Sequence, residues 1–193
     1  MRKTTLFIGI TVALFSCIKQ SEKTFTGNTV VELDAAVLNA TATGVTYPIL
    51  TRKALHGVPV ATTDSTLRRF TGLVRLRINL VGPQSNKDET IGYKIFGSPI
   101  TSIAFPATAT GQTPSQALGT LAVSSAVSGT HFSPLNGVVT IPAKSSFGFI
   151  DLQVVNGAAT AGQARFLGIQ LDSSGTIKPN PNYNKIGLVI DQR

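Results

Sequence analysis

Apolar residues alternate with polar ones at a period of two along most of this chain, and this pattern constrains the fold more than any other feature. Between Val74 and Leu80, for example, the apolar residues are separated by Arg75, Arg77 and Asn79. Half-buried antiparallel strands have this period, because successive side chains point to opposite faces of a sheet. No segment has a convincing helical stripe. The expected strands lie near residues 31–37, 74–80, 91–95, 137–141, 148–154, 165–171 and 186–190.

About seven strands, with Gly and Pro at nearly every junction, predict an all-β fold, a single immunoglobulin-like antiparallel β-sandwich. In the strand at 148–154, Ile150 is expected to face the core, and Asp151 and Gln153 the outside. Residues 84–90, with Asp88 and Glu89, predict a hairpin turn. Residues 47–65 and 98–119 lack periodicity. Both are interpreted as long loops, with an irregular edge strand as the alternative for the first.

The N-terminal residues predict export. Arg2 and Lys3 precede an apolar run from Leu6 to Phe15, and the chain turns polar after Cys17. A basic start, an apolar stretch of about ten residues and a small residue before the cleavage point are typical of a secretory signal. The run is about half the roughly 20 residues that a membrane-spanning helix needs. A short buried helix is the alternative, but it leaves the basic start unexplained.

Cys17 is the only cysteine of the chain, so an internal disulfide is impossible. The residues Leu14-Phe15-Ser16-Cys17 resemble the bacterial lipobox, in which signal peptidase II cuts before a diacylglyceryl-modified cysteine. The resemblance implies a lipid on Cys17, and more than one long acyl chain makes such anchoring stable. We therefore expect a signal peptide at 1–16, a lipidated tether at 17–28 and the β-sandwich domain at 29–193. The expected location is the cell envelope, as an outer-membrane lipoprotein.

The charge balance is basic, with 17 Lys and Arg against 9 Asp and Glu. The only clusters are Arg68-Arg69 and the pair Arg75 and Arg77, and this pair is a candidate for binding an anionic partner. A nucleic-acid reader needs a basic stripe with aromatic residues between the charges, and the chain has no Trp. A solvated basic surface is therefore favoured over nucleic-acid binding.

The chain carries few residues of the kinds that catalysis needs. Its two histidines, His56 and His131, lie far apart, and it has no H-E-x-x-H metal spacing, G-x-S-x-G elbow or phosphate-binding Gly-Lys motif. Glycoside hydrolysis requires two carboxylates across a cleft, and Asp88 and Glu89 are better explained as turn charges. We therefore expect that the protein is not an enzyme and that it binds no cofactor and no metal.

One segment has a specific pattern. A Gly129-Thr130-His131-Phe132 corner leads to a G-x-V-T-I-P-A strand from Gly137, then to a partner strand and an R-x-L-x-I-x-L strand from Arg165. This order resembles the Calx-beta pattern. It is closer still to uncharacterised lipoprotein domains of Bacteroidota type, encoded beside starch-utilisation-type glycan transporters. The resemblance covers about residues 73–190. It implies a sandwich on the cell envelope that usually binds rather than catalyses.

Calcium is not expected to bind. The Calx-beta family binds it through acids after the partner strand and before the next, where this chain has no carboxylate at 155–157 or 161–164. Calcium takes 6–8 oxygen ligands, with Asp and Glu supplying the charge. The nearest acids, Asp151 and Asp172, are not expected to converge.

His131 and Phe132 are candidate binding residues. A structural interpretation competes with this one. In it, Gly129 permits a tight turn, Phe132 plugs the end of the sandwich and His131 hydrogen-bonds the loop backbone.

These observations favour a non-enzymatic envelope lipoprotein that binds an extracellular glycan or other polymer for uptake or adhesion. The alternative is a structural or protein-interaction module of an outer-membrane complex, bridging envelope proteins by a strand edge or a sheet face. Sugar binding usually requires exposed aromatic side chains, and the candidates are Phe25, Phe70, Phe96, Phe105, Phe149, Tyr47, Tyr93 and Tyr183.

Overall fold

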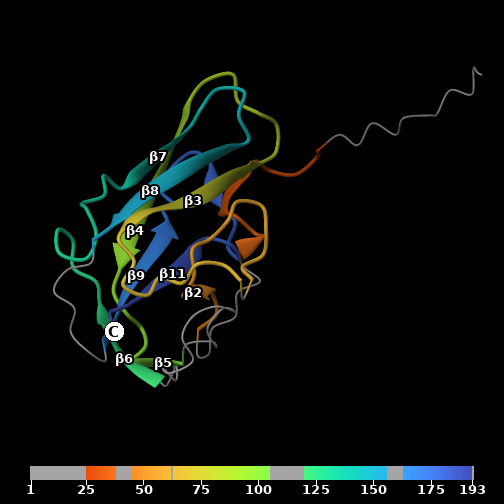
Figure 1. The fold of residues 1–193 in the computed structure, drawn as a ribbon. Coiled ribbons are helices and arrows are strands. Elements are labelled where there is room, and N and C mark those ends of the chain that lie inside the picture. Colours follow the sequence, from red (N-terminus) through yellow and green to blue (C-terminus); the bar gives the residue numbers. More distant parts are fainter. Residues whose placement is uncertain (1–24, 38–44, 62, 105–119, 156–162, 193) are drawn as a thin grey trace, which may run out of the picture.

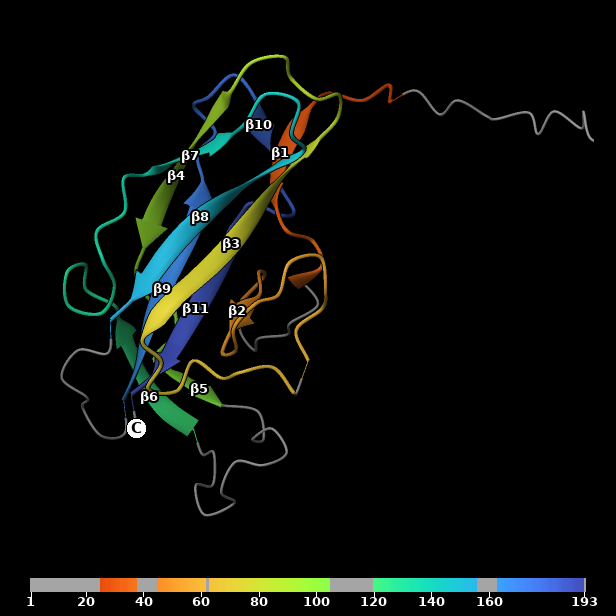
Figure 2. The same ribbon diagram turned by 45° about the horizontal axis from the view of Figure 1, so that its top comes forward.

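The described residues form two packed β-sheets. The computed structural model describes residues 25–37, 45–61, 63–104, 120–155 and 163–192, and Figures 1 and 2 show β3 and β8 stacked in front of β9 and β11. The first sheet has the order β10 (Lys178–Pro179), β1 (Val30–Leu33), β3 (Gly72–Val81) and β8 (Phe147–Val154). The second has the order β2 (Ile49–Leu50), β11 (Lys185–Asp191), β9 (Gln163–Leu171), β4 (Glu89–Phe96) and β7 (Val138–Ile141).

Two further strands extend the second sheet. β6 (Thr120–Ser125) pairs with the first half of β9, and β5 (Ser102–Ala104) pairs with β6. Most strand pairs are antiparallel, but β1–β10, β2–β11 and β6–β9 are parallel. The all-β sandwich is confirmed, with eleven strands in the described residues instead of about seven. The additional strands are short, and β2, β5 and β10 have too few residues to display a period.

The main core lies between the two sheets. The apolar residues of β3 from Val74 to Leu80 all face it and are at most 5% exposed. On β8, Ile150 faces the core while Asp151 and Gln153 are exposed, as their alternation predicts. Ile95 departs from its predicted pattern, because it is 43% exposed on β4.

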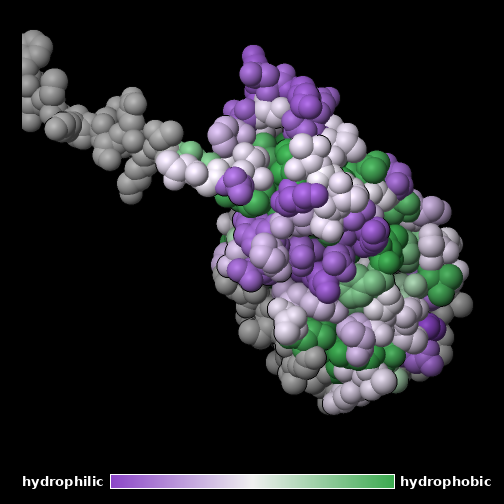
Figure 3. Space-filling view, turned by 180° about the vertical axis from the view of Figure 1, so that it is seen from behind, coloured by the Kyte–Doolittle hydropathy of each residue, from purple (hydrophilic) through white to green (hydrophobic). Residues whose placement is uncertain are grey.

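A second apolar cluster covers the outer face of the second sheet. It contains Phe166 and Val189, which point away from the main core, and Tyr47 and Phe96 pack against it. β9 and β11 are therefore almost entirely buried on both faces. Figure 3 shows the molecule from behind, where hydrophilic residues gather in the upper part and hydrophobic patches lie among neutral residues in the lower part.

Two glycines make room for this cluster. Gly168 and Gly187 lie directly opposite each other on β9 and β11. A Cβ atom on Gly168 would lie 2.4 Å from the Phe96 ring, and one on Gly187 would lie 2.6 Å from the Phe166 ring. Both distances are well below the 3.5–4.0 Å of an ordinary carbon–carbon contact. The aromatic rings thus occupy the space that the missing side chains leave.

Two sequence predictions require correction. Residues 84–90 do not close a hairpin, since β3 and β4 belong to different sheets and the turn crosses between them. The strand predicted at 31–37 ends at Leu33, and Asp34 is 4% exposed instead of facing solvent. The cost of burying the Asp34 carboxylate is offset by its ion pair with Arg77.

The expected loops are only partly irregular. The region 47–65 contains β2, and 98–119 contains β5. Residues 105–119, with Phe105, lie outside the described residues, as do the expected signal peptide, Cys17 and most of the tether. The described part of the chain contains no helix with the length and hydropathy of a membrane span.

Candidate binding face

The outer face of β3 and β8 carries a row of aromatic and charged side chains, here called the aromatic–arginine strip: Arg75, Arg77, Phe147, Phe149 and Asp151. The strand register sets Arg75 opposite Asp151 and Arg77 opposite Phe149. Side chains opposite or diagonal to each other on one face of an antiparallel pair lie within contact distance. The strip is therefore a direct product of the alternating pattern.

Arg75 and Asp151 form a bidentate ion pair. The Nε and Nη2 atoms of Arg75 donate to the two carboxylate oxygens of Asp151 at 2.7 and 2.9 Å. The hydrogen bond from Arg75 lowers the pKa of Asp151, so this carboxylate stays charged under ordinary conditions. Both side chains remain nearly half exposed, at 45% and 48%, and can form further hydrogen bonds.

The guanidinium groups also contact aromatic rings along the diagonals. The Cζ atom of Arg75 lies 4.9 Å from the centre of the Phe149 ring, and that of Arg77 lies 5.8 Å from the centre of the Phe147 ring. These distances are within the range of cation–π attraction. The two rings meet edge to face with centres 5.5 Å apart. His56 continues the row, since its ring centre lies 4.7 Å from that of Phe149.

A buried aspartate anchors the second arginine. The Nε atom of Arg77 lies 3.1 Å from Oδ2 of Asp34, whose side chain is 5% exposed. The same oxygen accepts a hydrogen bond of 2.8 Å from the backbone N–H of Gly57. Gly57 has a φ of +69°, and a Cβ there would lie 3.4 Å from Nη2 of Arg77. A glycine therefore suits this turn, which holds His56 beside the strip.

The hollow beside the strip is small. It is lined by Asp34, His56, Arg75 and Arg77 together with apolar core residues, and its volume is about 10 Å³. A space of this size holds about one water molecule. A ligand larger than a water molecule would therefore lie on the strip and not inside the hollow. Of the residues that line the hollow, His56 has a pKa that is lowered by burial and then by the positive charge of Arg77, which favours the neutral ring.

The structure places the sequence-predicted residues in two locations. Arg75 and Arg77 come together on the strip. His131 and Phe132 lie elsewhere and are 6% and 2% exposed. Gly129 has a φ of +81°, Phe132 belongs to the main core, and Nδ1 of His131 accepts a hydrogen bond of 2.8 Å from the backbone of Val127. These are the contacts that the structural interpretation of the corner predicts.

Sequence reasoning missed three residues of this region. Phe147 is not among the aromatic candidates, although it lies on β8 and faces the same side of the sheet as Phe149. Asp34 and His56 reach the strip from distant parts of the chain, and no sequence pattern links them to β3. Among the other candidates, Tyr93 is 5% exposed, and Phe96 packs on Phe166 with ring centres 5.8 Å apart.

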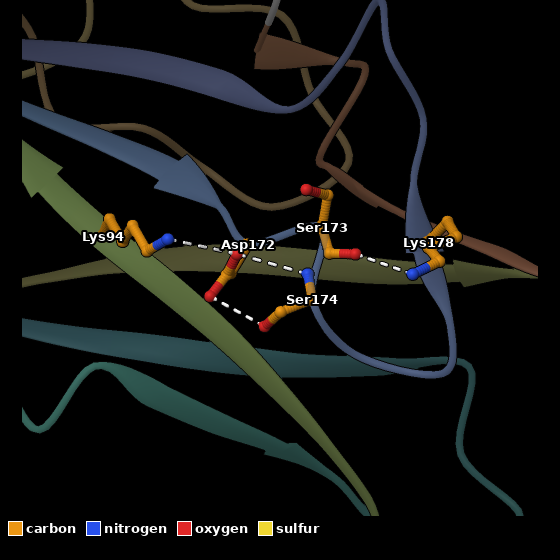
Figure 4. A network of polar contacts seen from close by, with 5 residues as sticks. All are labelled: Lys94, Asp172, Ser173, Ser174 and Lys178. Carbon is orange, nitrogen blue, oxygen red and sulfur yellow. Dashed lines mark hydrogen bonds and ion pairs between the residues drawn. The ribbon is translucent and has the colours of Figure 1, made fainter.

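The two acids nearest the expected calcium position do not converge. Asp151 lies on the outer face of the first sheet, while Asp172 follows β9 in the second. Figure 4 shows Asp172 accepting a hydrogen bond of 3.0 Å from the Ser174 hydroxyl and lying 3.3 Å from Nζ of Lys94. Within the described ranges, no three His, Cys, Asp or Glu residues are grouped so that they could hold a metal ion.

Comparison with known proteins gives a fold likeness only. No protein-family model matches the chain, and no curated protein matches it. A solved structure, the apo form of the Calx CBD1 domain, is 11% identical with a TM-score of 0.46, over 84% of this chain and 96% of that one. CBD12 of CALX1.2 and of CALX1.1 are 12% and 14% identical with TM-scores of 0.41 and 0.39. The match covers 63% of this chain and 40% and 39% of those chains. Likenesses at these values carry no argument about function.

Proposed function

We propose that this protein is a non-enzymatic envelope lipoprotein whose aromatic–arginine strip binds an extracellular polysaccharide. The observation that carries the proposal is the juxtaposition of the Phe147 and Phe149 rings with the half-exposed Arg75–Asp151 pair. Binding sites commonly combine an apolar aromatic surface with a few well-placed polar groups. Here both kinds of group share one face of a sheet.

The chemistry of the strip suits a neutral or weakly charged sugar chain. An aromatic ring offers a flat apolar surface to the C–H face of a pyranose, while hydroxyl groups need donors and acceptors nearby. Arg75 has five N–H donors, of which Asp151 takes two, and the Asp151 carboxylate has lone pairs beyond those that Arg75 uses. Because Arg75 faces Asp151 and Arg77 faces Asp34, the strip does not depend on an anionic ligand.

The geometry favours a polymer lying across the sheet. The adjoining hollow, at about 10 Å³, is too small for a sugar ring. A strip two strands wide instead offers successive contacts to an extended chain. Anchoring by a lipid on Cys17 would hold this strip at the cell envelope, and the expected tether would carry it away from the membrane.

Bridging of envelope proteins by a strand edge is less well supported. β8 is the edge strand of its sheet, but its own chain covers both ends of that edge. Ser145 bonds the backbone N–H and C=O of Phe147 at 3.2 and 2.8 Å, and the N–H of Ser133 donates to the C=O of Gln153 at 2.9 Å. Covered ends of this kind discourage strand addition.

The test is affinity electrophoresis of the full chain in gels that contain neutral or acidic soluble polysaccharides. Wild-type protein should be retarded by at least one polymer. The double variant Phe147→Ala/Phe149→Ala should bind at least about tenfold more weakly, which corresponds to about 1.4 kcal/mol. Phe25→Ala is the matched control, because Phe25 and Phe147 are both 43% exposed and only Phe147 belongs to the strip.

Two outcomes would contradict the proposal. One is wild-type mobility that no polysaccharide in the panel changes. The other is retardation that the double variant keeps while its melting temperature shows that it is folded. Co-purification of an envelope protein that depends on the same two rings would assign the strip to a protein partner instead.

A further inference from the structure

A cluster of hydrogen-bond donors lies at the end of the sandwich near the C-terminus, marked C in Figure 1, on elements other than those that form the aromatic–arginine strip. Arg165 is on β9, and Gln192 follows β11 directly. His131 lies in the corner between β6 and β7. None of these side chains takes part in the proposed polysaccharide binding.

Arg165 is surrounded by neutral partners. Its Nε donates to Oε1 of Gln192 at 3.0 Å, its Nη2 donates to Oε1 of Gln163 at 3.0 Å, and its Nη1 donates to the hydroxyl of Ser124. The ion pairs among the described residues pair Arg68, Arg75, Arg77 and Lys94 with aspartates and do not include Arg165. Its positive charge is therefore not compensated by a carboxylate in the described part of the chain.

Gln192 adds a donor without an acceptor. Its side chain is almost fully buried, at 1% exposure. Because the Nε of Arg165 can only donate, the carbonyl oxygen of Gln192 must face it, and this fixes the orientation of the amide. The Nε2 group then points elsewhere, buried and with no hydrogen-bond partner. An orphaned buried donor is costly and calls for a water molecule or an ion.

His131 supplies a third donor. Its Nδ1 accepts the hydrogen bond from the Val127 backbone, so in the neutral ring the proton is on Nε2. The segment that leads into the His131 corner is joined to β9 next to Arg165, because the backbone N–H of Ala126 donates to the C=O of Phe166 at 2.7 Å. Burial, and then the positive charge of Arg165, lower the pKa of His131. The cluster thus combines one uncompensated cation with donors on an amide and an imidazole.

We propose that Arg165, Gln192 and His131 bind a small oxyanion, namely a carboxylate or sulfate group. An oxyanion supplies both the acceptor that the Gln192 amide lacks and the negative charge that Arg165 lacks among the described residues. A water molecule would supply the acceptor alone and would leave the charge of Arg165 uncompensated. The guanidinium retains donors for the task, since the three bonds named above leave two of its five N–H groups unused.

The experiment follows the side-chain amide signals of the ¹⁵N-labelled full chain by NMR during titration with sodium acetate or sodium sulfate at constant ionic strength. The Gln192 amide signal should shift and saturate with at least one anion, and the two titrations distinguish carboxylate from sulfate. The Asn180 amide is an internal reference, because it already donates to Glu32 at 3.0 Å.

Variants assign the shift to the site. Arg165→Gln should lose it, while Lys87→Gln, which removes an exposed charge from the turn after β3, should keep it. If Arg165→Gln fails to fold, Gln192→Glu provides the second test. It places a carboxylate beside Arg165. The imidazole signal of His131, which should also shift with the anion in the wild type, should then no longer respond. A wild-type Gln192 signal that never saturates, or an anion response that survives in either variant when that variant is folded, would overturn the proposal.

Discussion

Gly187→Ala tests whether the second apolar cluster depends on the glycine pair. The new methyl carbon would lie 2.6 and 2.9 Å from two atoms of the Phe166 ring and 3.2 Å from Cγ1 of Ile49. Phe166 is 1% exposed, so its ring has little room to move. Overpacking of a core costs about 1–3 kcal/mol, while replacing glycine by alanine recovers about 0.4–1 kcal/mol through the unfolded chain.

The net loss should be about 1–2 kcal/mol, or about 2–8 °C in melting temperature for a domain of this size. Urea denaturation of the full chain measures the free energy of unfolding. Gly175→Ala is the control, because the nearest atom to its added carbon is 3.8 Å away, and it should be neutral or slightly stabilising. A Gly187→Ala variant at least as stable as the wild type would refute the reasoning. Combining it with Phe166→Leu should cost less than the sum of the two single changes, because the smaller side chain relieves the contact.

Three further predictions concern register, anchoring and metal. Ile150→Asp should unfold the domain while Gln153→Asp leaves it folded, since an unpaired buried carboxylate costs several kcal/mol; equal thermal melts would contradict the register. Cys17→Ser should abolish incorporation of a palmitate analogue without lowering the melting temperature, and label that persists in the variant would rule out lipidation at this residue. Chelation of calcium should leave the melting temperature unchanged, whereas an occupied site at 100 times its Kd would contribute about 2.7 kcal/mol; a shift of several degrees on adding millimolar calcium would reveal such a site.

The alternating pattern correctly predicted which face of long strands such as β3 and β8 is buried, because packing against the core determines both the apolar positions in the sequence and the buried face. On β3, the residues that point inward, such as Val74, pack in the main core and must be apolar. Arg75 and Arg77 point outward and can be polar. Where a strand is buried on both faces, as β9 is, alternation no longer identifies the outside. The R-x-L-x-I-x-L spacing of β9 marks one buried face, but nothing local shows that Phe166 is buried on the other.

Features that depend on contacts between distant segments were beyond sequence reasoning. The burial of Asp34 becomes favourable only when Arg77 and the Gly57 turn surround it. Gln192 near the C-terminus is an ordinary polar residue in the sequence, and its orphaned amide is apparent only beside Arg165. The strip was anticipated in part, since its arginines and Phe149 were identified while Phe147, at the start of β8, was not.

The parallel pairing of β1 with β10 has a consequence for when the chain can fold. Val30, in the first strand, pairs with Lys178, and Ile49 in β2 pairs with Gly187 in the last strand. β2 therefore lacks its strand partner, and β1 lacks one of its two partners, until the final part of the chain has emerged. Folds that rely on such distant pairings form slowly. Under the export that we propose, this delay would keep the polypeptide open to transport, and the sandwich would close only after β11 has been released.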